Sequence, residues 1–181
     1  MQSDATITQN ALAPAQRWRL PLSSAMEPLP EGYRFAEEKD FPRLTEIWTE
    51  AFPGDRDADA QAFFAIYYNK ERILVFEPDG RIVTMCSLFQ IELNEGPALY
   101  LYALATDAAY RGRGIGKNLL ALLYKRYGMP LLVDPEHTGV ERFYQNYGFT
   151  PIAEEELLKI AERNGILNLL LDPPGEGYIL R

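Results

Sequence analysis

The feature that most restricts the possible folds of this chain is a glycine-rich loop between a strand-like run and a helix-like run. The run ALYLYALAT at residues 98–106 is typical of a buried sheet strand, and KNLLALLYKRY at 117–127 has the leucine spacing of a helix. The loop between them, YRGRGIG at 110–116, has glycine at residues 112, 114 and 116. Backbone N–H groups at a helix N-terminus have no partner within the helix and attract anions. The pattern therefore predicts a ligand with phosphate groups, held where the strand leads into the helix.

Two common phosphate-binding motifs do not fit this loop. A Walker loop needs glycine at the position of Arg111, and Ser or Thr at the position of Asn118. A dinucleotide fingerprint needs a third glycine where the chain has Lys117, and it also requires a parallel βαβ unit. The strand before this loop belongs instead to an antiparallel run. The loop therefore predicts neither a nucleoside triphosphatase nor a dinucleotide-binding domain.

The interpretation that remains is a pyrophosphate held by consecutive backbone amides at the start of the helix. The three glycines let the backbone approach a ligand without Cβ atoms in the way. Arg111, Arg113 and Lys117 add positive charge, and no Asp or Glu occurs from residue 108 to residue 132. This basic patch stands out in a chain whose formal net charge is -8.

Strand-like and helix-like patterns alternate around the loop. Asp79-Gly80 joins two strand-like runs, ERILVF and RIVTMCSLFQIEL, as an antiparallel hairpin. Helices are predicted at 44–51, 57–70, 117–127 and 139–149 and in EEELLKIAERNG, and further strands at 33–36 and in PLLVDPE, GILNLLL and GYILR. This order predicts an α/β fold with a central mixed, mostly antiparallel sheet flanked by helices.

The length and the first residues indicate how the chain is divided. A chain of 181 residues fits one domain with a sizeable core. Residues 1–30 are rich in Ala, Ser, Thr, Gln and Pro and end in PLPEG, so we expect an extended N-terminal arm. RWRLPL at 17–22 is a candidate edge strand within it. We expect residues 31–181 to form a single domain.

The composition argues against several classes of function. The net charge of -8 disfavours broad nucleic-acid binding and mildly favours a cationic substrate or partner. The single cysteine, Cys86, cannot form an internal disulfide, so we expect a reducing compartment, with the cytoplasm as the default. No apolar run approaches the ~20 residues that span a bilayer, and the N-terminus lacks the pattern of an export signal. No set of residues predicts a metal site.

The chain resembles the GCN5-related N-acetyltransferase (GNAT) family. That family's acetyl-coenzyme A motif is Arg or Gln, two residues, Gly, one residue, and then Gly or Ala, which matches Arg111, Gly114 and Gly116. The strand before the motif and the helix after it reproduce the context that the family requires. The later segment ERFYQNYGF at 141–149 resembles the family's Phe-Tyr-x-x-x-Gly-Phe segment. The resemblance covers roughly residues 33–151 and implies a GNAT-like sheet flanked by helices.

The resemblance implies a site for acetyl-coenzyme A. The pantetheine arm of the coenzyme is expected to pair with the strand backbone at 104–106, where a main-chain N–H would face the thioester carbonyl. His137 stands where members of the family commonly carry an Asn that helps to hold the coenzyme. The residues expected to bind the coenzyme are Leu104, Ala105, Thr106, Arg111, Gly112, Arg113, Gly114, Ile115, Gly116, Lys117, His137 and Phe143.

Acetyl transfer needs a neutral amine, stabilisation of an oxyanion and a proton for the departing thiolate. The resemblance implies that Tyr144 is the general acid, and the alternative role for this ring is packing against the coenzyme or the core. The resemblance does not assign the base, because many members carry an acidic residue where this chain has Tyr102. Glu92 on the preceding strand is a carboxylate candidate, and a water relay is an equal alternative.

We therefore expect an acetyl-coenzyme A dependent N-acetyltransferase. It would transfer an acetyl group to a primary amine of a small molecule or peptide, by direct attack of the amine on the thioester. The alternative is a non-catalytic acyl-coenzyme A binding regulatory module, because a fold does not settle function. A third interpretation is an acyltransferase that uses longer acyl groups. The sequence leaves open the acceptor, the oligomeric state, with a homodimer among the options, and the role of the arm.

Overall fold

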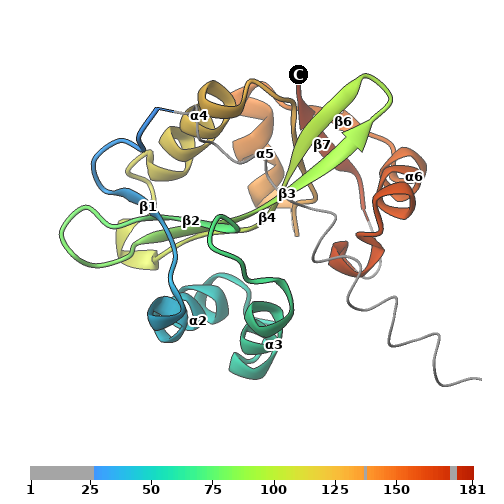
Figure 1. Cartoon of the computed structure of the whole chain (residues 1–181). Helices are drawn as coiled ribbons and strands as arrows, with labels where there is room; N and C mark the ends of the chain where they lie inside the picture. Colours follow the sequence, from blue (N-terminus) through green and yellow to red (C-terminus); the bar gives the residue numbers. More distant parts are fainter. Residues whose placement is uncertain (1–26, 137, 172–174) are drawn as a thin grey trace, which may run out of the picture.

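The computed structural model describes residues 27–136, 138–171 and 175–181, and it consists of one sheet with helices on both faces (Figure 1). Within these residues the sheet has seven strands, in the order β1-β2-β3-β4-β5-β7-β6. β4 and β5 are parallel, and the other neighbouring strands are antiparallel, which confirms the predicted mixed sheet. The strands are β1 (Tyr33–Phe35), β2 (Ile73–Phe76), β3 (Thr84–Leu93), β4 (Gly96–Thr106), β5 (Leu131–Val133), β6 (Thr150–Ile152) and β7 (Gly177–Leu180).

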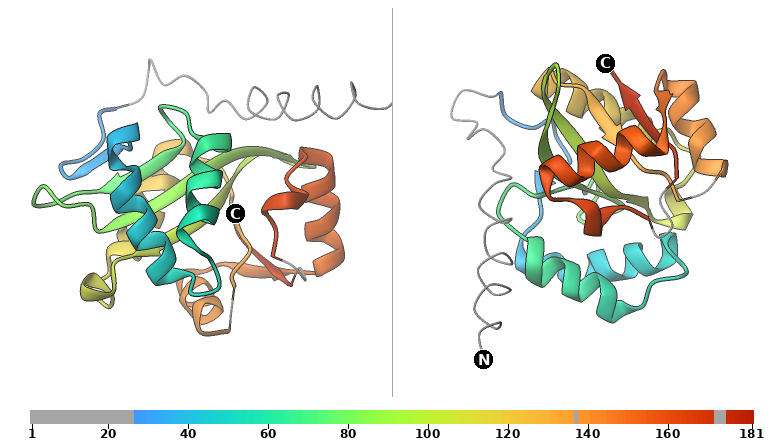
Figure 2. Two further views of the ribbon diagram at one scale, coloured as in Figure 1. Left: turned by 90° about the horizontal axis from the view of Figure 1, so that it is seen from below. Right: turned by 90° about the vertical axis from the view of Figure 1, so that its right-hand side faces the viewer.

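The helices divide between the two faces of the sheet. α2 and α3 cover one face, with α6 beyond them, and α4 and α5 cover the other face (Figures 1 and 2). Two clusters of buried apolar side chains correspond to these faces, and Trp48 of α2 shares its cluster with Ile160 of α6. The helices are α2 (Phe41–Ala51), α3 (Asp57–Tyr67), α4 (Ile115–Tyr127), α5 (Thr138–Tyr147) and α6 (Glu154–Asn164), with 3-10 helices η1 (Glu38–Asp40), η2 (Ala108–Tyr110) and η3 (Leu167–Leu169).

The predicted hairpin of β2 and β3 is confirmed. The two strands pair antiparallel from Ile73 opposite Ser87 to Phe76 opposite Thr84. Gly80 lies in the connection between them with a φ of 74°, a left-handed conformation that glycine adopts without a steric cost. The hairpin leads the chain into β3 and β4, the longest pair of strands and the support of the site described below.

The helix predicted after the glycine loop is α4, and glycine lies at each of its ends. Leu119, Leu120 and Leu123 are completely buried against the sheet. Gly114 precedes the helix with a φ of 76°, and Gly128 follows it with a φ of 59°. Left-handed glycines commonly terminate helices, and the one before α4 turns the chain sharply from the loop into the first helical turn.

The prediction of a strand at residues 165–171 is wrong. The segment contains the 3-10 helix η3, in which the N–H of Leu169 donates to the carbonyl of Ile166 at 2.9 Å. Both side chains are buried in the core beside α2 and α6. β7 already pairs with β5 on one side and β6 on the other, so neither of its edges is free for this segment. An apolar run indicates burial but does not distinguish a strand from a buried turn.

One predicted segment cannot be compared with the structure, and one observed strand was not predicted. The candidate edge strand RWRLPL and most of the expected arm at residues 1–30 lie outside the described residues. The short edge strand β6 has no counterpart among the sequence predictions. It pairs with β7 through Thr150, Pro151 and Ile152, directly after the turn at Gly148 that ends α5.

Candidate active site

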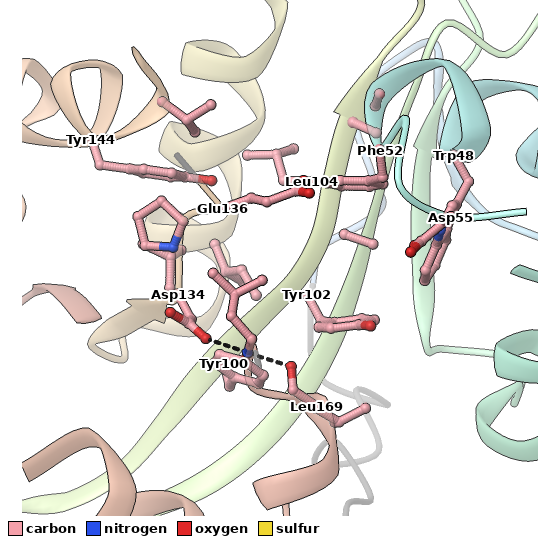
Figure 3. A pocket seen from close by; sticks show the side chains of 18 of the residues that line it. Trp48, Phe52, Asp55, Tyr100, Tyr102, Leu104, Asp134, Glu136, Tyr144 and Leu169 are labelled. Atoms are coloured by element: carbon pink, nitrogen blue, oxygen red, sulfur yellow. Dashed lines mark hydrogen bonds between the residues drawn. The ribbon is translucent and has the colours of Figure 1, made fainter. Parts of the chain in front are cut away.

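The candidate site is a cavity that lies where β4 and β5 separate (Figure 3). Among the described residues, these parallel strands pair only at Leu99 with Leu131 and at Tyr100 with Leu132. Beyond that point the strands diverge, and side chains from both strands, from the end of α2, from α5 and from the η3 segment line a cavity of about 540 Å³. The cavity therefore reaches both faces of the sheet.

An irregularity in β4 accompanies this separation. Met85 pairs with Ala105 but Ser87 pairs with Tyr102, so β4 holds one more residue than β3 over this stretch. Ala103 lies at this point with a φ of 53°, the one positive φ of a non-glycine residue in the part of the chain that the structure describes. Such a β-bulge bends its strand. On the side of β5, residues 104–106 have no strand partner among the described residues.

The lining divides between the two faces, and we name the two parts after the helices above them. The apolar members of the α4 side belong to the core cluster beneath α4 and α5. The apolar members of the α2 side, apart from Leu171, belong to the cluster beneath α2 and α3. Its two carboxylates accept hydrogen bonds from Trp48 and from the N–H of Leu171. The α4 side consists of Leu101, Leu104, Arg111, Val133, Val140 and Tyr144, and the α2 side of Trp48, Phe52, Asp55, Tyr100, Tyr102, Asp134 and residues 169–171.

The glycine loop on the α4 side has the backbone of an anion site. Gly112 and Gly114 have φ values of 75° and 76°, so both are left-handed. α4 begins without a side-chain cap and without an acidic residue in its first turn. Its first N–H groups and the positive end of its dipole are therefore available to an anion. Gly116 serves a different purpose, because a Cβ there would lie 3.3 Å from the ring of Phe143 on α5.

The basic side chains of the loop differ in their surroundings. Arg111 lines the cavity, and its Nε donates to the carbonyl oxygen of Thr106 at 2.9 Å. Arg113 donates from Nη2 to the carbonyl oxygen of Ala109 at 2.9 Å, and Lys117 is exposed. The loop thus keeps three cations near the start of α4. His137, the remaining residue expected at the coenzyme, lies outside the described residues.

Asp107 anchors this loop, and no sequence pattern predicts it. The residue is buried, and one of its carboxylate oxygens accepts the N–H of Ala109 at 2.9 Å. The carboxylate also forms ion pairs with Arg43 of α2 and Arg81 of the β2–β3 connection. The anchor joins residues that are far apart in the chain, which is why it is visible only in the fold.

Tyr144 of α5 points into the cavity from the α4 side (Figure 3). It is 5% exposed, and its ring packs against Phe143 and Phe149 at centroid distances of 5.1 and 5.2 Å. Burial raises the pKa of its hydroxyl, with a smaller contribution from Cys86. The phenol is therefore protonated at neutral pH, which is the form that a general acid requires, and the two ring contacts restrict its orientation.

Tyr102 lies on the α2 side and is held by other aromatic rings. Its ring stacks on Phe63 at a centroid distance of 5.0 Å and lies 5.7 Å from Trp48. Burial raises the pKa of Tyr102 to about 12, with smaller contributions from Asp55, Tyr67 and Glu136. A general base must begin the reaction deprotonated, so this environment suits a cavity wall better than a base.

Glu92, the carboxylate candidate for the base, does not line the cavity. It is exposed on β3 opposite Pro97, and its backbone N–H donates to Oδ1 of Asn164 on α6 at 2.8 Å. The cavity begins at Tyr100, farther along β4. The alternation of a strand indicates the face on which a side chain lies, but not its distance from a site.

The α2 side contains charged residues that no sequence motif marks. Oδ2 of Asp134 accepts the N–H of Leu171 at 2.9 Å, while Oδ1 is buried and has no partner among the described residues. Burial raises the pKa of this carboxyl, against the opposing effect of the Leu171 bond. Nε1 of Trp48 donates to Oδ2 of Asp55 at 2.6 Å. The position of Asp134, directly after the buried strand β5, is the sequence signal that could have identified it.

The described part of the chain contains neither a membrane-spanning helix nor a group of side chains suited to a metal ion. None of its helices has the length and apolar character needed to cross a membrane. In the same residues, His, Cys, Asp and Glu side chains form no group of three or more arranged to hold a metal ion.

Comparison with known proteins agrees with this geometry. Residues 69–151 match the model of the acetyltransferase (GNAT) domain, a stretch that contains β2 to β5, the glycine loop and Tyr144. No curated protein sequence matches the chain.

Several solved structures share the fold. The histone acetyltransferase HPA2 and related acetyltransferase from Corynebacterium glutamicum is 19% identical, with a TM-score of 0.61, over 83% of this chain and 96% of that one. The N-acetyltransferase YlbP of Bacillus subtilis, in complex with coenzyme A, is 14% identical, with a TM-score of 0.58, over 82% and 95%.

The N-acetylglutamate synthase of Neisseria gonorrhoeae, in complex with coenzyme A and N-acetyl-glutamate, is 18% identical with a TM-score of 0.62. The match covers 86% of this chain but 36% of the synthase. Identities this low establish the fold alone. Residues 69–151 thus match the acetyltransferase (GNAT) domain model, and the chain has the fold of the GCN5-related N-acetyltransferases.

Proposed function

We propose that this protein is an acetyl-coenzyme A dependent N-acetyltransferase that acts on a primary amine of a small molecule or peptide. The observation that carries the proposal is a single cavity lined both by Arg111 of the anion-binding loop and by the buried phenol of Tyr144. The match to the GNAT domain model and the coenzyme A complexes among the similar structures support it.

The loop and the bulged strand supply the proposed coenzyme contacts. The N–H groups of the first turn of α4 bind the pyrophosphate, and Arg111, Arg113 and Lys117 contribute positive charge. The backbone of residues 104–106 pairs with the pantetheine arm along the edge that β5 leaves free. Phe143 packs on Gly116 and keeps α5, and with it Tyr144, against the start of α4.

The proposed reaction is direct transfer. The nitrogen lone pair of a neutral amine attacks the thioester carbon, a C–N bond forms and the C–S bond breaks. A main-chain N–H at residues 104–106 donates to the carbonyl oxygen as it gains negative charge. Tyr144 gives its proton to the departing thiolate, and the amine nitrogen releases one proton to water. Positioned acids of this kind typically contribute ~10²-fold or more to the rate.

We also propose that the protein works in a reducing compartment such as the cytoplasm. The only cysteine of the chain, Cys86, is a buried free thiol. Burial raises the pKa of this thiol, which disfavours the reactive thiolate.

Two measurements on the purified chain test the proposed function. Acetyl-coenzyme A at one hundred times its Kd is expected to raise the free energy of unfolding by about 2.7 kcal/mol. Release of free coenzyme A thiol is then measured across a panel of primary amines, with reactions lacking amine as the control. Release above that control supports the enzyme. Stabilisation without release across the panel would favour the non-catalytic acyl-coenzyme A binding module, and no stabilisation would contradict the coenzyme site.

A further inference from the structure

We propose that the α2 side of the cavity is the acceptor subsite, and that it takes an apolar primary amine without a carboxylate group, which binds as an ammonium in contact with Asp134 and releases one proton to water before the neutral amine attacks. This inference rests on the proposed acetyl transfer and specifies which class of amine the site accepts.

The shape of the cavity determines the direction from which the acceptor approaches. Under the proposed function the coenzyme enters from the α4 side, because the loop at Arg111 and the first turn of α4 lie there. Its thioester then lies in the gap that opens between β4 and β5 beyond Tyr100. The remaining approach to that gap is the α2 side, where Figure 3 shows Tyr102 between Asp134 and Trp48.

The charged groups of the lining separate along the same direction. Arg111 is the one basic residue among the described residues that line the cavity, and it belongs to the coenzyme loop. The acidic lining residues are Asp55 and Asp134 on the α2 side and Glu136, whose carboxylate extends into the gap beside Leu104 (Figure 3). An acceptor that lies on the α2 side therefore meets carboxylates and no basic side chain of that lining. This arrangement favours a cation.

Asp134 presents an oriented carboxylate to the cavity. The residue lines the cavity and is half-buried, and the N–H of Leu171 donates to its Oδ2, while Oδ1 is enclosed by the protein. A carboxylate oxygen can accept more than one hydrogen bond, so Oδ2 keeps acceptor capacity beside the bond from Leu171. A primary ammonium carries three donors on a compact centre, so one of them can bond to this oxygen while the others reach further acceptors.

The rest of the α2 side is aromatic and apolar. Trp48 lies 5.7 Å from the rings of both Phe52 and Tyr102, and Leu169 and Leu170 of the η3 segment line the opposite part. The hydrogen bond from Nε1 of Trp48 to Asp55 fixes the indole and satisfies its only donor. Such a wall removes an apolar substrate body from water, which favours its binding, and aromatic faces also attract a nearby ammonium.

A free α-carboxylate on the acceptor is disfavoured by the same lining. In an amino acid the carboxylate is bonded to the carbon that bears the amine, so it would enter the space beside Asp134. Two carboxylates that share a partly buried site repel each other, and no basic residue of the described α2-side lining offsets this repulsion. The amide of the same amino acid carries no such charge and escapes the penalty.

A trio of matched ligands tests the inference on the unmodified protein. Phenethylamine, phenylalanine amide and phenylalanine share one aromatic body and differ in the group beside the amine. With saturating acetyl-coenzyme A, thiol release is expected to give a kcat/KM for the first two at least about 10-fold above that for phenylalanine, or 1.4 kcal/mol. Equal or better use of phenylalanine would overturn the inference.

Asp134→Asn tests the proposed contact. The asparagine oxygen can still accept the N–H of Leu171, but the charge is lost and an amide NH₂ replaces Oδ1. We expect kcat/KM for phenethylamine to fall at least about 10-fold, with acetyl-coenzyme A affinity unchanged within about 2-fold. Glu136→Gln removes the same charge from an exposed lining residue and is expected to change kcat/KM less than about 3-fold. An equal loss in both variants would mean that the negative charge of the cavity as a whole attracts the amine, and it would contradict a direct contact with Asp134.

Calorimetry separates this inference from the proposed function. Phenethylamine is titrated into the complex of the protein with coenzyme A, where no transfer occurs. Binding that weakens in Asp134→Asn supports the subsite even if thiol release is absent, in which case acetyl transfer fails alone. The opposite outcome is thiol release with other amines while phenethylamine neither binds nor reacts. That outcome would support acetyl transfer and refute the proposed subsite. If the variant does not fold, as judged by its melting curve, the ligand trio decides.

Discussion

The two sides of the cavity are built in opposite ways. On the α4 side, the proposed coenzyme contacts come largely from the backbone of one continuous stretch, residues 104–117: a bulged strand edge, two left-handed glycines and the N–H groups of one helical turn. The α2 side is assembled from side chains of four separate segments, the end of α2, the middle of β4, the end of β5 and the η3 segment. Backbone contacts suit a ligand that is always the same, whereas side chains can be changed one at a time to suit different acceptors.

The largest effect should come from Tyr144, which projects into the gap between the two sides. Tyr144→Phe keeps the ring and its packing but removes the proton proposed for the thiolate, so kcat should fall at least about 10-fold. Steady-state thiol release measures it, and acetyl-coenzyme A affinity should stay within about 2-fold. Tyr147→Phe, on the same helix and outside the cavity lining, is the matched control. An unchanged rate in Tyr144→Phe would reject the acid role.

A smaller effect, confined to the α4 side, is expected from Gly114→Val. The φ of 76° forces a side chain into a left-handed conformation that costs about 1–3 kcal/mol. If the loop adjusts to relieve this strain, the anion site is lost, and acetyl-coenzyme A should bind roughly 10-fold more weakly in calorimetry. Gly128→Val introduces similar strain at the far end of the same helix and should lower stability without changing coenzyme affinity. Equal affinity losses in both variants would contradict a local role for the loop.

The pH dependence should separate the two sides. Burial raises the pKa of Asp134, so this carboxylate takes up a proton at a higher pH than an exposed one as the pH falls. Once protonated it no longer attracts an ammonium, so kcat/KM for the amine should fall more steeply on the acid side than the loss of neutral amine alone requires. This additional fall should be missing in Asp134→Asn. Tyr100 faces it from β4 and stays protonated, because burial raises its pKa well above the usual value. Glu136→Gln identifies any contribution of the neighbouring carboxylate. An unaltered acid limb in Asp134→Asn would reject the assignment.

The smallest effect is expected at Glu92. The side chain is exposed and lies outside the cavity lining, beside α6. Glu92→Gln should therefore leave kcat and kcat/KM within about 2-fold of the original protein, in the same thiol-release assay. A loss comparable to that of Tyr144→Phe would show that this carboxylate acts in the reaction despite its position.

The same contrast explains how much of the molecule could be predicted from the sequence. The pattern of Gly112, Gly114 and Gly116 is local, so the strand, loop and helix that follow from it are correctly predicted. The segment at 165–171 is buried but does not pair with a strand. Its apolar residues would be the same in a buried strand and in a buried turn, so the sequence does not distinguish the two. Oδ2 of Asp134 meets the N–H of Leu171 across 37 positions of sequence, and such a pair leaves no local pattern. The α2 side therefore required the fold to be known.

Trp48 gives one part of this protein an optical signal of its own. The chain has two tryptophans, Trp18 and Trp48, and Trp18 lies outside the described residues. With Trp18 replaced by phenylalanine, the intrinsic fluorescence would come from a single indole that is 3% exposed, bonded to Asp55 and in contact with the proposed acceptor space. Indole emission shifts with the polarity and motion of its surroundings, so an arriving amine would alter its spectrum without any added label. Occupancy by the acceptor could then be followed in real time, in the same sample in which released thiol records turnover.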